Sequence, residues 1–495
     1  MNFSELIHKV LQSGLKVEFD FKVEGITYDS RKVEHGFIFF AIRGYKQDGK
    51  EFIQDAVAKG AKAVFTESED IIELREKYSG VNLITSFNVR KVMARISGEF
   101  FGNPGKKLKL IGVTGTNGKT TIVSLIKHIL DNNGSKCGLL GTVDYELGNV
   151  KKSSSLTTPD SVEINQMLSE MVNAGLEFCA MEVSSIALVL DRVYGLNFSS
   201  AVFTNLSSEH LDLHKNMENY FNAKKILFDN LSSHSVAISN SDDEYGKRIL
   251  NETEAEKMFY SMNSESNLRA FNEKISIDGF KFEVKFKNKK YIVESLLTGR
   301  FNIYNILAAL AVSINLGIEL ENAIKAIKTF KAVNGRFNKI NLPNGAYAVI
   351  DYSHTSDSLK NAIEAAIEIR EKQKVKGKVI TIFGCGGNKD KTKRSVMGNL
   401  ATTLSDYSII TSDNPRFENP MEIISEILSG VKTKGNFEVE ENRELAIKKG
   451  IELSANSDII LICGKGHETY QEVKGVKSHF DDKEIVEKYS ILVKI

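Results

Sequence analysis

The segment LKLIGVTGTNGKTT, residues 108–121, runs from an apolar stretch through two closely spaced glycines into a polar stretch. The apolar part, LKLIGV at 108–113, is typical of a buried strand, and TIVSLIKHILDNNG at 121–134 is typical of a helix. Strand, glycine turn and helix in this order favour phosphate binding, because N–H groups of the turn and of the helix N-terminus point at the anion. The turn departs from the standard Walker pattern, because Val113 stands five positions before Gly118.

Two side chains of the turn add to this chemistry. Lys119 supplies a point charge, and the hydroxyl of Thr120 can hold Mg²⁺. A glycine turn with no ligand is the alternative, and the strand–GKT–helix context argues against it. The predicted phosphate-binding residues are Gly115, Thr116, Asn117, Gly118, Lys119, Thr120 and Thr121.

Strands and helices alternate on both sides of this segment, which predicts an α/β protein with helix-flanked parallel sheets. We expect three domains, as a length of 495 residues suggests at roughly 150 residues per domain. They are a small α/β domain at 1–100, a central P-loop-type mononucleotide-binding domain at 101–333 and a Rossmann-like domain at 334–495. Residues 268–297 alternate with period two and predict an antiparallel insertion.

The composition excludes several function classes. Lys plus Arg total 65 and Asp plus Glu 64, so no overall field draws the chain to nucleic acid or to an anionic membrane. No apolar run approaches the roughly 18 residues that cross a bilayer. MNFSELIHKVLQ at 1–12 predicts an amphipathic helix and not an export signal, so we expect a cytoplasmic protein. The cysteines are widely spaced, which predicts buried thiols and no zinc site or disulfide: Cys137, Cys179, Cys385 and Cys463.

Two candidate metal ligands follow strands of the central domain. Glu182 ends the strand-like LEFCAMEV, where its carboxylate would face the bound phosphates; capping the next helix is the alternative. TNLSSEHLDLH at 204–214 follows another strand, which we expect to be its neighbour, and would place His210 beside Glu182. Oxygen and imidazole ligands are compatible with Mg²⁺ at this edge of the sheet.

A lysine on an apolar helix face is a third candidate. In ENYFNAKKILFDNL at 218–231, Lys224 falls in the middle of the apolar stripe and Lys225 at its edge. Burial of an ammonium is costly and lowers its pKa. The side chain either extends to water or takes up CO₂ as a carbamate, a two-oxygen anion that could join Glu182 and His210 at Mg²⁺.

The last domain combines opposite charges at the ends of its predicted strands. SDNPRFENP at 412–420 places Asp413, Asn414 and Arg416 in one loop, and GKGHETYQ at 464–471 adds Glu468. Arginine can grip a carboxylate through two parallel hydrogen bonds, so Arg and Glu on adjacent strand ends would suit an amino acid. A surface ion pair is the alternative. Asp351 and His354 could touch ribose or phosphate but are weak evidence alone.

Taken together, these segments resemble the Mur ligase family, most closely its members that add the third amino acid to UDP-N-acetylmuramoyl-L-Ala-D-Glu in peptidoglycan synthesis. The resemblance covers nearly the whole chain. Besides the motifs quoted above, it rests on TYDSR (27–31), SLTTPD (155–160), EVSS (182–185), GRFNIYN (299–305), NGRF (334–337), DYSHT (351–355), GCGGNKDKTKR (384–394) and FDD (480–482).

The resemblance implies an ATP-dependent amide ligase that uses Mg²⁺, with UDP-binding, ATPase and amino-acid-binding domains in chain order. Its implied catalytic residues are Lys119, Glu182, His210 and Lys224, the last as a carbamate that holds Mg²⁺ with Thr120, Glu182 and His210. The implied UDP-substrate residues are Ser30, Thr157, Thr158, Ser184 and Arg192, and further nucleotide contacts are Asn302, Asn305, Arg336 and Asp351. DNPR resembles the form that accepts meso-2,6-diaminopimelate, through Lys389, Asp413, Asn414, Arg416, Gly464 and Glu468.

The chain departs from the family pattern at six positions: Lys50, Ile186, Leu190, Asn334, Asn338 and Lys389. Three of these, Lys50, Ile186 and Leu190, fall on the UDP-substrate side. Three interpretations therefore stand beside diaminopimelate ligation: transfer of L-lysine or another diamino acid, an altered acceptor, and a silent paralogue that only binds a precursor. We expect a monomer whose partners are small substrates.

Overall fold

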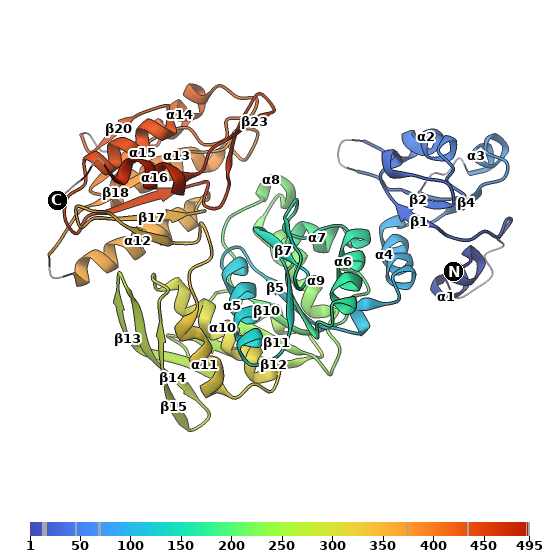
Figure 1. Cartoon of the computed structure of the whole chain (residues 1–495), viewed down its shortest axis with the longest axis horizontal. Helices are drawn as coiled ribbons and strands as arrows, with labels where there is room; N and C mark the ends of the chain where they lie inside the picture. Colours follow the sequence, from blue (N-terminus) through green and yellow to red (C-terminus); the bar gives the residue numbers. More distant parts are fainter. Residues whose placement is uncertain are drawn as a thin grey trace.

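The computed structural model describes residues 1–11, 17–44, 47–67, 71–373, 375–432, 435–491 and 493. Its described part has three sheet-centred bodies in chain order, which we call the N-terminal, central and C-terminal parts (Figure 1). Each consists of strands covered by helices, so the predicted α/β class is confirmed.

The N-terminal part has a parallel sheet in the order β1-β2-β3-β4. Helix α1 buries Phe3, Leu6, Ile7 and Val10 on one face, which confirms the predicted amphipathic helix over its described residues. The elements are α1 (Phe3–Leu11), β1 (Gly25–Thr27), η1 (Ser30–Lys32), β2 (Phe37–Ala41), η2 (Gly49–Phe52), α2 (Ile53–Ala58), β3 (Ala63–Thr66), α3 (Ile71–Lys77), β4 (Asn82–Thr85) and α4 (Val89–Phe100).

The central part is organised around β5 (Lys109–Thr114), which pairs in parallel with β9 on one side and β10 on the other. Helix α5 (Lys119–Asn132) follows it directly and buries its apolar face on the sheet. The remaining elements up to β12 are η3 (Pro104–Lys106), β6 (Cys137–Leu140), β7 (Asp144–Glu146), β8 (Lys151–Ser153), α6 (Ser161–Asn173), β9 (Phe178–Glu182), α7 (Ser185–Val189), β10 (Phe198–Phe203), α8 (Leu211–His214), α9 (Met217–Asp229), β11 (Val236–Asn240), η4 (Arg248–Leu250) and β12 (Glu256–Ser261).

An antiparallel extension completes this sheet. Strands β13 (Leu268–Ser276), β14 (Gly279–Phe286) and β15 (Lys289–Ser295) pair antiparallel, as predicted. They are not a separate insertion, because β13 pairs in parallel with β12 and so prolongs the central sheet. Helices α10 (Phe301–Asn315) and α11 (Leu320–Thr329) close the central part, with α10 packed against α5.

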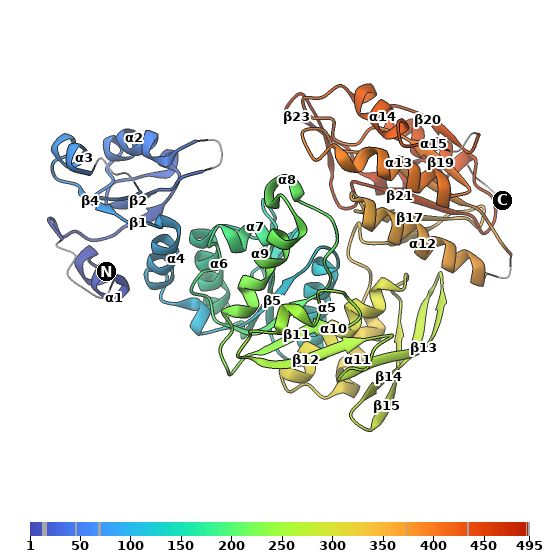
Figure 2. The same ribbon diagram turned by 180° about the vertical axis from the view of Figure 1, so that it is seen from behind.

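The C-terminal part has a sheet in the order β16-β17-β21-β18-β19-β20, parallel except for the β16–β17 pair, and a hairpin of β22 and β23. Helices cover the sheet (Figures 1 and 2). Its elements are β16 (Asn338–Asn341), β17 (Tyr347–Asp351), α12 (Ser356–Lys372), β18 (Val379–Phe383), α13 (Thr392–Leu404), β19 (Tyr407–Ile410), α14 (Pro420–Leu428), β20 (Phe437–Val439), α15 (Arg443–Glu452), β21 (Ile459–Cys463), β22 (Tyr470–Val473), β23 (Val476–His479) and α16 (Asp482–Ser490).

The N-terminal part contacts the central part through α4 and α6, on the side away from the C-terminal part (Figures 1 and 2). The four cysteines are buried free thiols, as predicted. Among the described helices, none combines the length and apolar composition that crossing a bilayer requires.

Candidate active site

A cleft of about 940 Å³ lies between the central and C-terminal parts. The turn before α5, the loops after β9 and β10, and the start of α10 line it from the central part. Loops after β17, β18, β19 and β21 line it from the C-terminal part. Its volume lies at the upper end of the roughly 300–1,000 Å³ of small-molecule pockets, so it has room for a large ligand.

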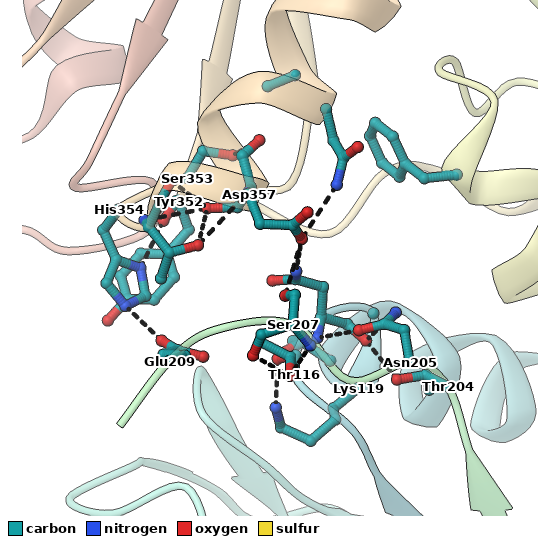
Figure 3. A pocket seen from close by; sticks show the side chains of 18 of the residues that line it. Thr116, Lys119, Thr204, Asn205, Ser207, Glu209, Tyr352, Ser353, His354 and Asp357 are labelled. Carbon is teal, nitrogen blue, oxygen red and sulfur yellow. Dashed lines mark hydrogen bonds and ion pairs between the residues drawn. The ribbon is translucent and has the colours of Figure 1, made fainter. Parts of the chain in front are cut away.

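The phosphate-binding turn is held by the loop that follows β10 (Figure 3). The Thr204 hydroxyl donates to the Asn117 carbonyl at 2.7 Å, and the Asn117 N–H donates to the Asn205 side-chain oxygen at 2.9 Å. Gly115 has φ +148°, and a Cβ there would lie 1.8 Å from the Thr204 hydroxyl, so only glycine fits. The first N–H groups of α5 have no acceptor within the helix, which leaves them for an anion.

Two lysines converge on this turn. Lys119 Nζ donates to the carbonyls of Gly115 and Thr116, both at 2.8 Å, and Lys224 Nζ donates to the Gly115 carbonyl at 2.9 Å. Burial lowers the pKa of Lys224, and the charge of Lys119 lowers it further. Burial also lowers the pKa of Lys119. The site therefore disfavours two ammonium groups side by side.

The predicted burial of Lys224 is confirmed. Its side chain is 1% exposed and lies over the Tyr220 ring, 4.4 Å from the centroid. Lys225 reaches outward instead, to Asp229 at 2.7 Å and Glu252 at 2.6 Å. Because an α-helix has 3.6 residues per turn, the adjacent side chains of Lys224 and Lys225 point in different directions, as the sequence predicts.

Glu182 and His210 lie on either side of the turn. The prediction that their strands are neighbours is wrong, because β5 runs between β9 and β10. One Glu182 oxygen accepts from the Thr142 N–H at 2.7 Å, and the other from the Thr142 hydroxyl at 3.0 Å. His210 adopts a left-handed conformation, φ +56°, directly before α8, and its ring lies nearly perpendicular to that of Tyr220.

The donors around the turn fit a magnesium ion shared with a nucleotide. Within the described residues, no three His, Cys, Asp or Glu side chains gather as a metal cage. Mg²⁺ usually takes one or two carboxylates plus phosphate oxygens and water, so a full cage is not needed. The buried carboxylate of Glu182 and the hydroxyl of Thr120, which accepts from Arg336 at 3.0 Å, are oxygen donors of this kind.

The predicted nucleotide contacts on α10, before β16 and at the end of β17 also line the cleft. The Asn305 amide donates to the Asn302 oxygen at 2.8 Å. Arg336 lies over the Tyr352 ring and keeps a buried Nε without a partner among the described residues. Asp351 accepts from the backbone N–H groups of Phe337 and Ser353, which fixes the loop after β17.

Two carboxylates that sequence reasoning missed connect the central and C-terminal parts (Figure 3). Asp357 accepts from the Asn117 amide and the Ser207 hydroxyl, both at 2.9 Å. Glu209 lies 3.4 Å from His354 Nε2. Burial alone would raise the pKa of Glu209, but the hydrogen bond and charge of His354 hold it below its ordinary value. Glu209 directly precedes His210, and Asp357 lies two residues after the DYSHT motif, so their places beside predicted site residues are the signal that could have indicated them.

The residues predicted to bind the amino acid lie on the side of the cleft that the C-terminal part forms. All of them line the cleft: Lys389, Asp413, Asn414, Arg416, Gly464 and Glu468. The strands before them are not adjacent as expected, because β18 lies between β19 and β21. The Asn414 amide donates to Glu468 at 2.7 Å. Arg416, at φ +51°, donates to the Gly387 carbonyl at 2.9 Å.

The predicted UDP-substrate residues do not form one group. The Thr158 hydroxyl donates to the Glu182 carbonyl, and Arg192 donates to the Thr158 carbonyl, both at 2.8 Å. Ser184 caps α7, and Thr157 lines the cleft. Ser30 lies apart, in the N-terminal part, where its carbonyl accepts from Lys59 at 3.0 Å.

The six departures from the family pattern are dispersed. Ile186 and Lys389 line the cleft. Leu190 ends α7 and Asn338 begins β16, while Lys50 and Asn334 are exposed.

Comparison with known proteins gives a consistent result. The model of the Mur ligase family catalytic domain matches residues 22–101, that of the Mur ligase middle domain matches 113–313, and that of the glutamate ligase domain of Mur ligases matches 335–466. The UDP-N-acetylmuramoyl-L-alanyl-D-glutamate–2,6-diaminopimelate ligase of Clostridium tetani is 41% identical over 488 residues, covering 98% of each chain. The protein of the same name from Aquifex aeolicus is 42% identical over 465 residues, covering 94% of this chain and 93% of the relative.

Solved structures agree. A diaminopimelate ligase structure superposes with a TM-score of 0.69 at 30% identity and covers 99% of both chains. The MurF ligase of Thermotoga maritima in complex with ADP shares the fold, with a TM-score of 0.64 at 18% identity, covering 95% of this chain and 97% of that one. Three family models in chain order and relatives matched along nearly their whole length show that the chain belongs to the Mur ligase family.

Proposed function

We propose that the protein is an ATP-dependent ligase that adds meso-2,6-diaminopimelate to UDP-N-acetylmuramoyl-L-Ala-D-Glu. The observation that carries the proposal is the single cleft onto which both the phosphate-binding turn and the pocket of Asn414, Arg416 and Glu468 open. A phosphorylated acceptor and an incoming amine can therefore meet without leaving the protein. The names of the relatives supply the identity of the substrates.

In the first step, the D-Glu side-chain carboxylate attacks the γ-phosphate of ATP, which gives an acyl phosphate and ADP. Negative charge accumulates among the phosphate oxygens, and Lys119 and the N–H groups of α5 offset it. In the second step, the neutral amine of diaminopimelate attacks the acyl carbon, phosphate leaves, and an amide forms. Arg416 and Glu468 hold the far carboxylate and ammonium of the diamino acid.

Mg²⁺ would supply positive charge to the phosphates and polarise them. Thr120 and Glu182 would hold it beside the nucleotide, and Glu182, His210 and the carbamate of Lys224 would hold a second ion. The carbamate forms when the neutral Lys224 amine adds to CO₂ and loses a proton. Two ammonium groups at one carbonyl oxygen are unfavourable, so conversion of Lys224 to an anion relieves the repulsion.

The proposal assigns UDP-substrate binding to residues 1–100, ATP binding to 101–333 and amino-acid binding to 334–495. Ser30 is the proposed acceptor contact in the N-terminal part, and the central part adds four more: Thr157, Thr158, Ser184 and Arg192. Contact of Asp357 with the phosphate-binding turn supports a closed arrangement that keeps water from the acyl phosphate. The enzyme would work as a monomer in the cytoplasm on small substrates.

The test is a matrix of candidate acceptors against candidate amino acids, read by mass spectrometry of the products. We expect an amide product only when ATP, the muramoyl dipeptide and diaminopimelate are present together. Preferred transfer of L-lysine would make L-lysine, and not diaminopimelate, the amino-acid substrate. Product formation on another acceptor would indicate that the departures at Lys50, Ile186 and Leu190 change which acceptor the enzyme uses. Nucleotide or precursor binding without any product would favour the silent paralogue.

A further inference from the structure

Lys465 is a buried lysine that neither the phosphate chemistry nor the amino-acid contacts proposed above use. Its side chain is fully buried, and its Nζ donates to the Asn414 side-chain oxygen at 3.0 Å. It also lies 3.6 Å from Glu468 Oε2 and near the rings of Tyr470 and Phe480. A buried ammonium is costly, so a lysine here must be compensated by the groups that it contacts.

The contacts of Asn414 allow one orientation of its amide. Its oxygen accepts from Lys465 Nζ at 3.0 Å and from the Glu472 N–H at 2.9 Å. Its nitrogen donates to Glu468 Oε2 at 2.7 Å. The opposite orientation would set an NH₂ group against an ammonium and an N–H, and an oxygen against a carboxylate. Because an ammonium and a backbone N–H donate only, Lys465 and the Glu472 N–H together determine which way the Asn414 amide points.

Asn414 in turn fixes Glu468. The hydrogen bond from Asn414 and the charge of Lys465 both act on Oε2, while Oε1 makes no hydrogen bond within the described part of the chain. Glu468 lines the cleft, so this second oxygen remains for a ligand. Burial and the charge of Asp413 raise the pKa of Glu468, and Lys465 opposes both effects.

We propose that Lys465 is a positioning residue for amino-acid specificity: acting through Asn414, it holds the Glu468 carboxylate so that one oxygen receives an ammonium of the incoming diamino acid. The inference rests on the proposed function of this cleft and deepens it. Lys465 touches no substrate in this scheme. Without it, the Asn414 oxygen keeps only the Glu472 N–H as a donor, so the amide is held less firmly, and Glu468 loses the nearby positive charge.

A purely structural role would have a different signature. Loss of a structural cation would damage every partial reaction equally, because the whole C-terminal part would be affected. Loss of a positioning residue would affect only steps that need the amino acid. Hydroxylamine separates the two cases, since it attacks the acyl phosphate as a small nucleophile without needing the amino-acid pocket.

The experiment compares Lys465→Met with the wild-type full-length protein in the presence of ATP and Mg²⁺. We expect the KM for diaminopimelate to rise on the order of tenfold to hundredfold, as loss of a charge-assisted hydrogen bond predicts. Hydroxamate formation from the muramoyl dipeptide and hydroxylamine should stay within about threefold of wild type, because the phosphate site is intact. Lys483→Met, at an exposed lysine of the same C-terminal part, is the matched control and should change neither reaction.

A double variant tests whether Lys465 acts through Asn414. Lys465→Met combined with Asn414→Ala should raise the KM for diaminopimelate by less than the product of the two single effects, because the part of the Lys465 effect that passes through Asn414 is already lost in Asn414→Ala. If the increases in KM of the two single variants multiply in the double variant, Lys465 does not act through Asn414. Asn414→Asp keeps the size of the side chain and sets an oxygen against Glu468, so it tests the same orientation if Lys465→Met does not fold. It should raise the same KM while hydroxamate formation persists.

The outcomes are distinct. An unchanged KM for diaminopimelate in Lys465→Met or Asn414→Asp would overturn the inference while wild-type ligation still supports the proposed function. Equal loss of hydroxamate formation and ligation in both variants would also overturn it. A wild-type protein that forms neither hydroxamate nor the diaminopimelate amide would overturn both.

Discussion

Lys119 and Lys224 donate to the same backbone oxygen, the carbonyl of Gly115, at 2.8 and 2.9 Å. One lysine comes from the phosphate-binding turn and the other from α9, more than a hundred residues later. Lys224 is buried and Lys119 is half-buried, and the pKa of Lys224 is lowered by burial and by the charge of Lys119. Because the two lysines share one acceptor, the total charge beside the phosphate-binding turn depends on the charge state of Lys224.

Lys224→Ala should reduce ligation by at least about a hundredfold, as expected when charged contacts at a reacting centre are lost. A small added carboxylate, such as acetate, should partly restore activity by replacing the carbamate oxygens. Lys225→Ala is the control, because its side chain pairs with Asp229 and Glu252 at the surface of α9. In wild-type protein under ¹³CO₂, NMR should show a carbamate signal that is absent in Lys224→Ala. Full activity of Lys224→Ala would remove the carbamate from the mechanism.

Asp357→Ala should uncouple ATP hydrolysis from amide formation. Its carboxylate accepts from Asn117 and Ser207, the two hydrogen bonds by which it ties α12 to the phosphate-binding turn and its supporting loop. At about 0.5–1.5 kcal/mol each, their loss predicts a fall in kcat/KM of roughly fivefold to a hundredfold.

The ratio of phosphate released to amide formed should rise in this variant, because water reaches the acyl phosphate. Asn361→Ala is the control, since Asn361 donates to the same carboxylate at 3.2 Å from within α12 and makes no hydrogen bond to the central part among the described residues. A normal phosphate-to-amide ratio in Asp357→Ala would show that the contact plays no part in excluding water.

Arg416→Lys should raise the KM for diaminopimelate strongly and leave the KM for ATP unchanged. Lysine keeps the charge but lacks the planar fork that binds a carboxylate through two bonds. The left-handed backbone at position 416 is equally unfavourable for arginine and for lysine, so the exchange should leave the loop conformation unchanged. Steady-state kinetics with each substrate varied separately gives the answer. Equal damage to both substrates would indicate a folding role.

The ion pair of Arg443 and Asp482 predicts a stability effect away from the cleft. Both side chains are fully buried and joined by two hydrogen bonds, at 2.7 and 2.8 Å. Arg443→Met would leave a buried carboxylate unpaired and should lower the free energy of unfolding by about 3–5 kcal/mol. Urea denaturation measures this, with Lys448→Met, at a half-buried lysine of the same helix that pairs with Glu452, as control. A double variant with Asp482→Asn should lose less than Arg443→Met alone, and an equal or larger loss would contradict the pairing argument.

The features that sequence predicted best are local ones. Helical periodicity placed Lys224 inside and Lys225 outside, because the 3.6-residue period is a property of a single helix. The phosphate-binding turn could also be predicted from the sequence, because strand, glycines and helix follow one another without interruption.

Relationships between distant segments could not be predicted in the same way. Strand order depends on long-range pairing, so the position of β5 between β9 and β10, and of β18 between β19 and β21, was missed. Asp357 and Glu209 were overlooked because their partners are contributed by another part of the chain. Lys465 stands between two glycines in a polar motif, where no apolar pattern indicates burial.

The most direct test measures phosphate and amide together in one reaction with ATP, UDP-N-acetylmuramoyl-L-Ala-D-Glu and meso-2,6-diaminopimelate. We predict one phosphate released for each tripeptide product formed, and little phosphate release when either the dipeptide or diaminopimelate is left out. Phosphate release that is independent of both substrates, or steady turnover with no amide product, would contradict the proposal that this cleft couples ATP to diaminopimelate transfer.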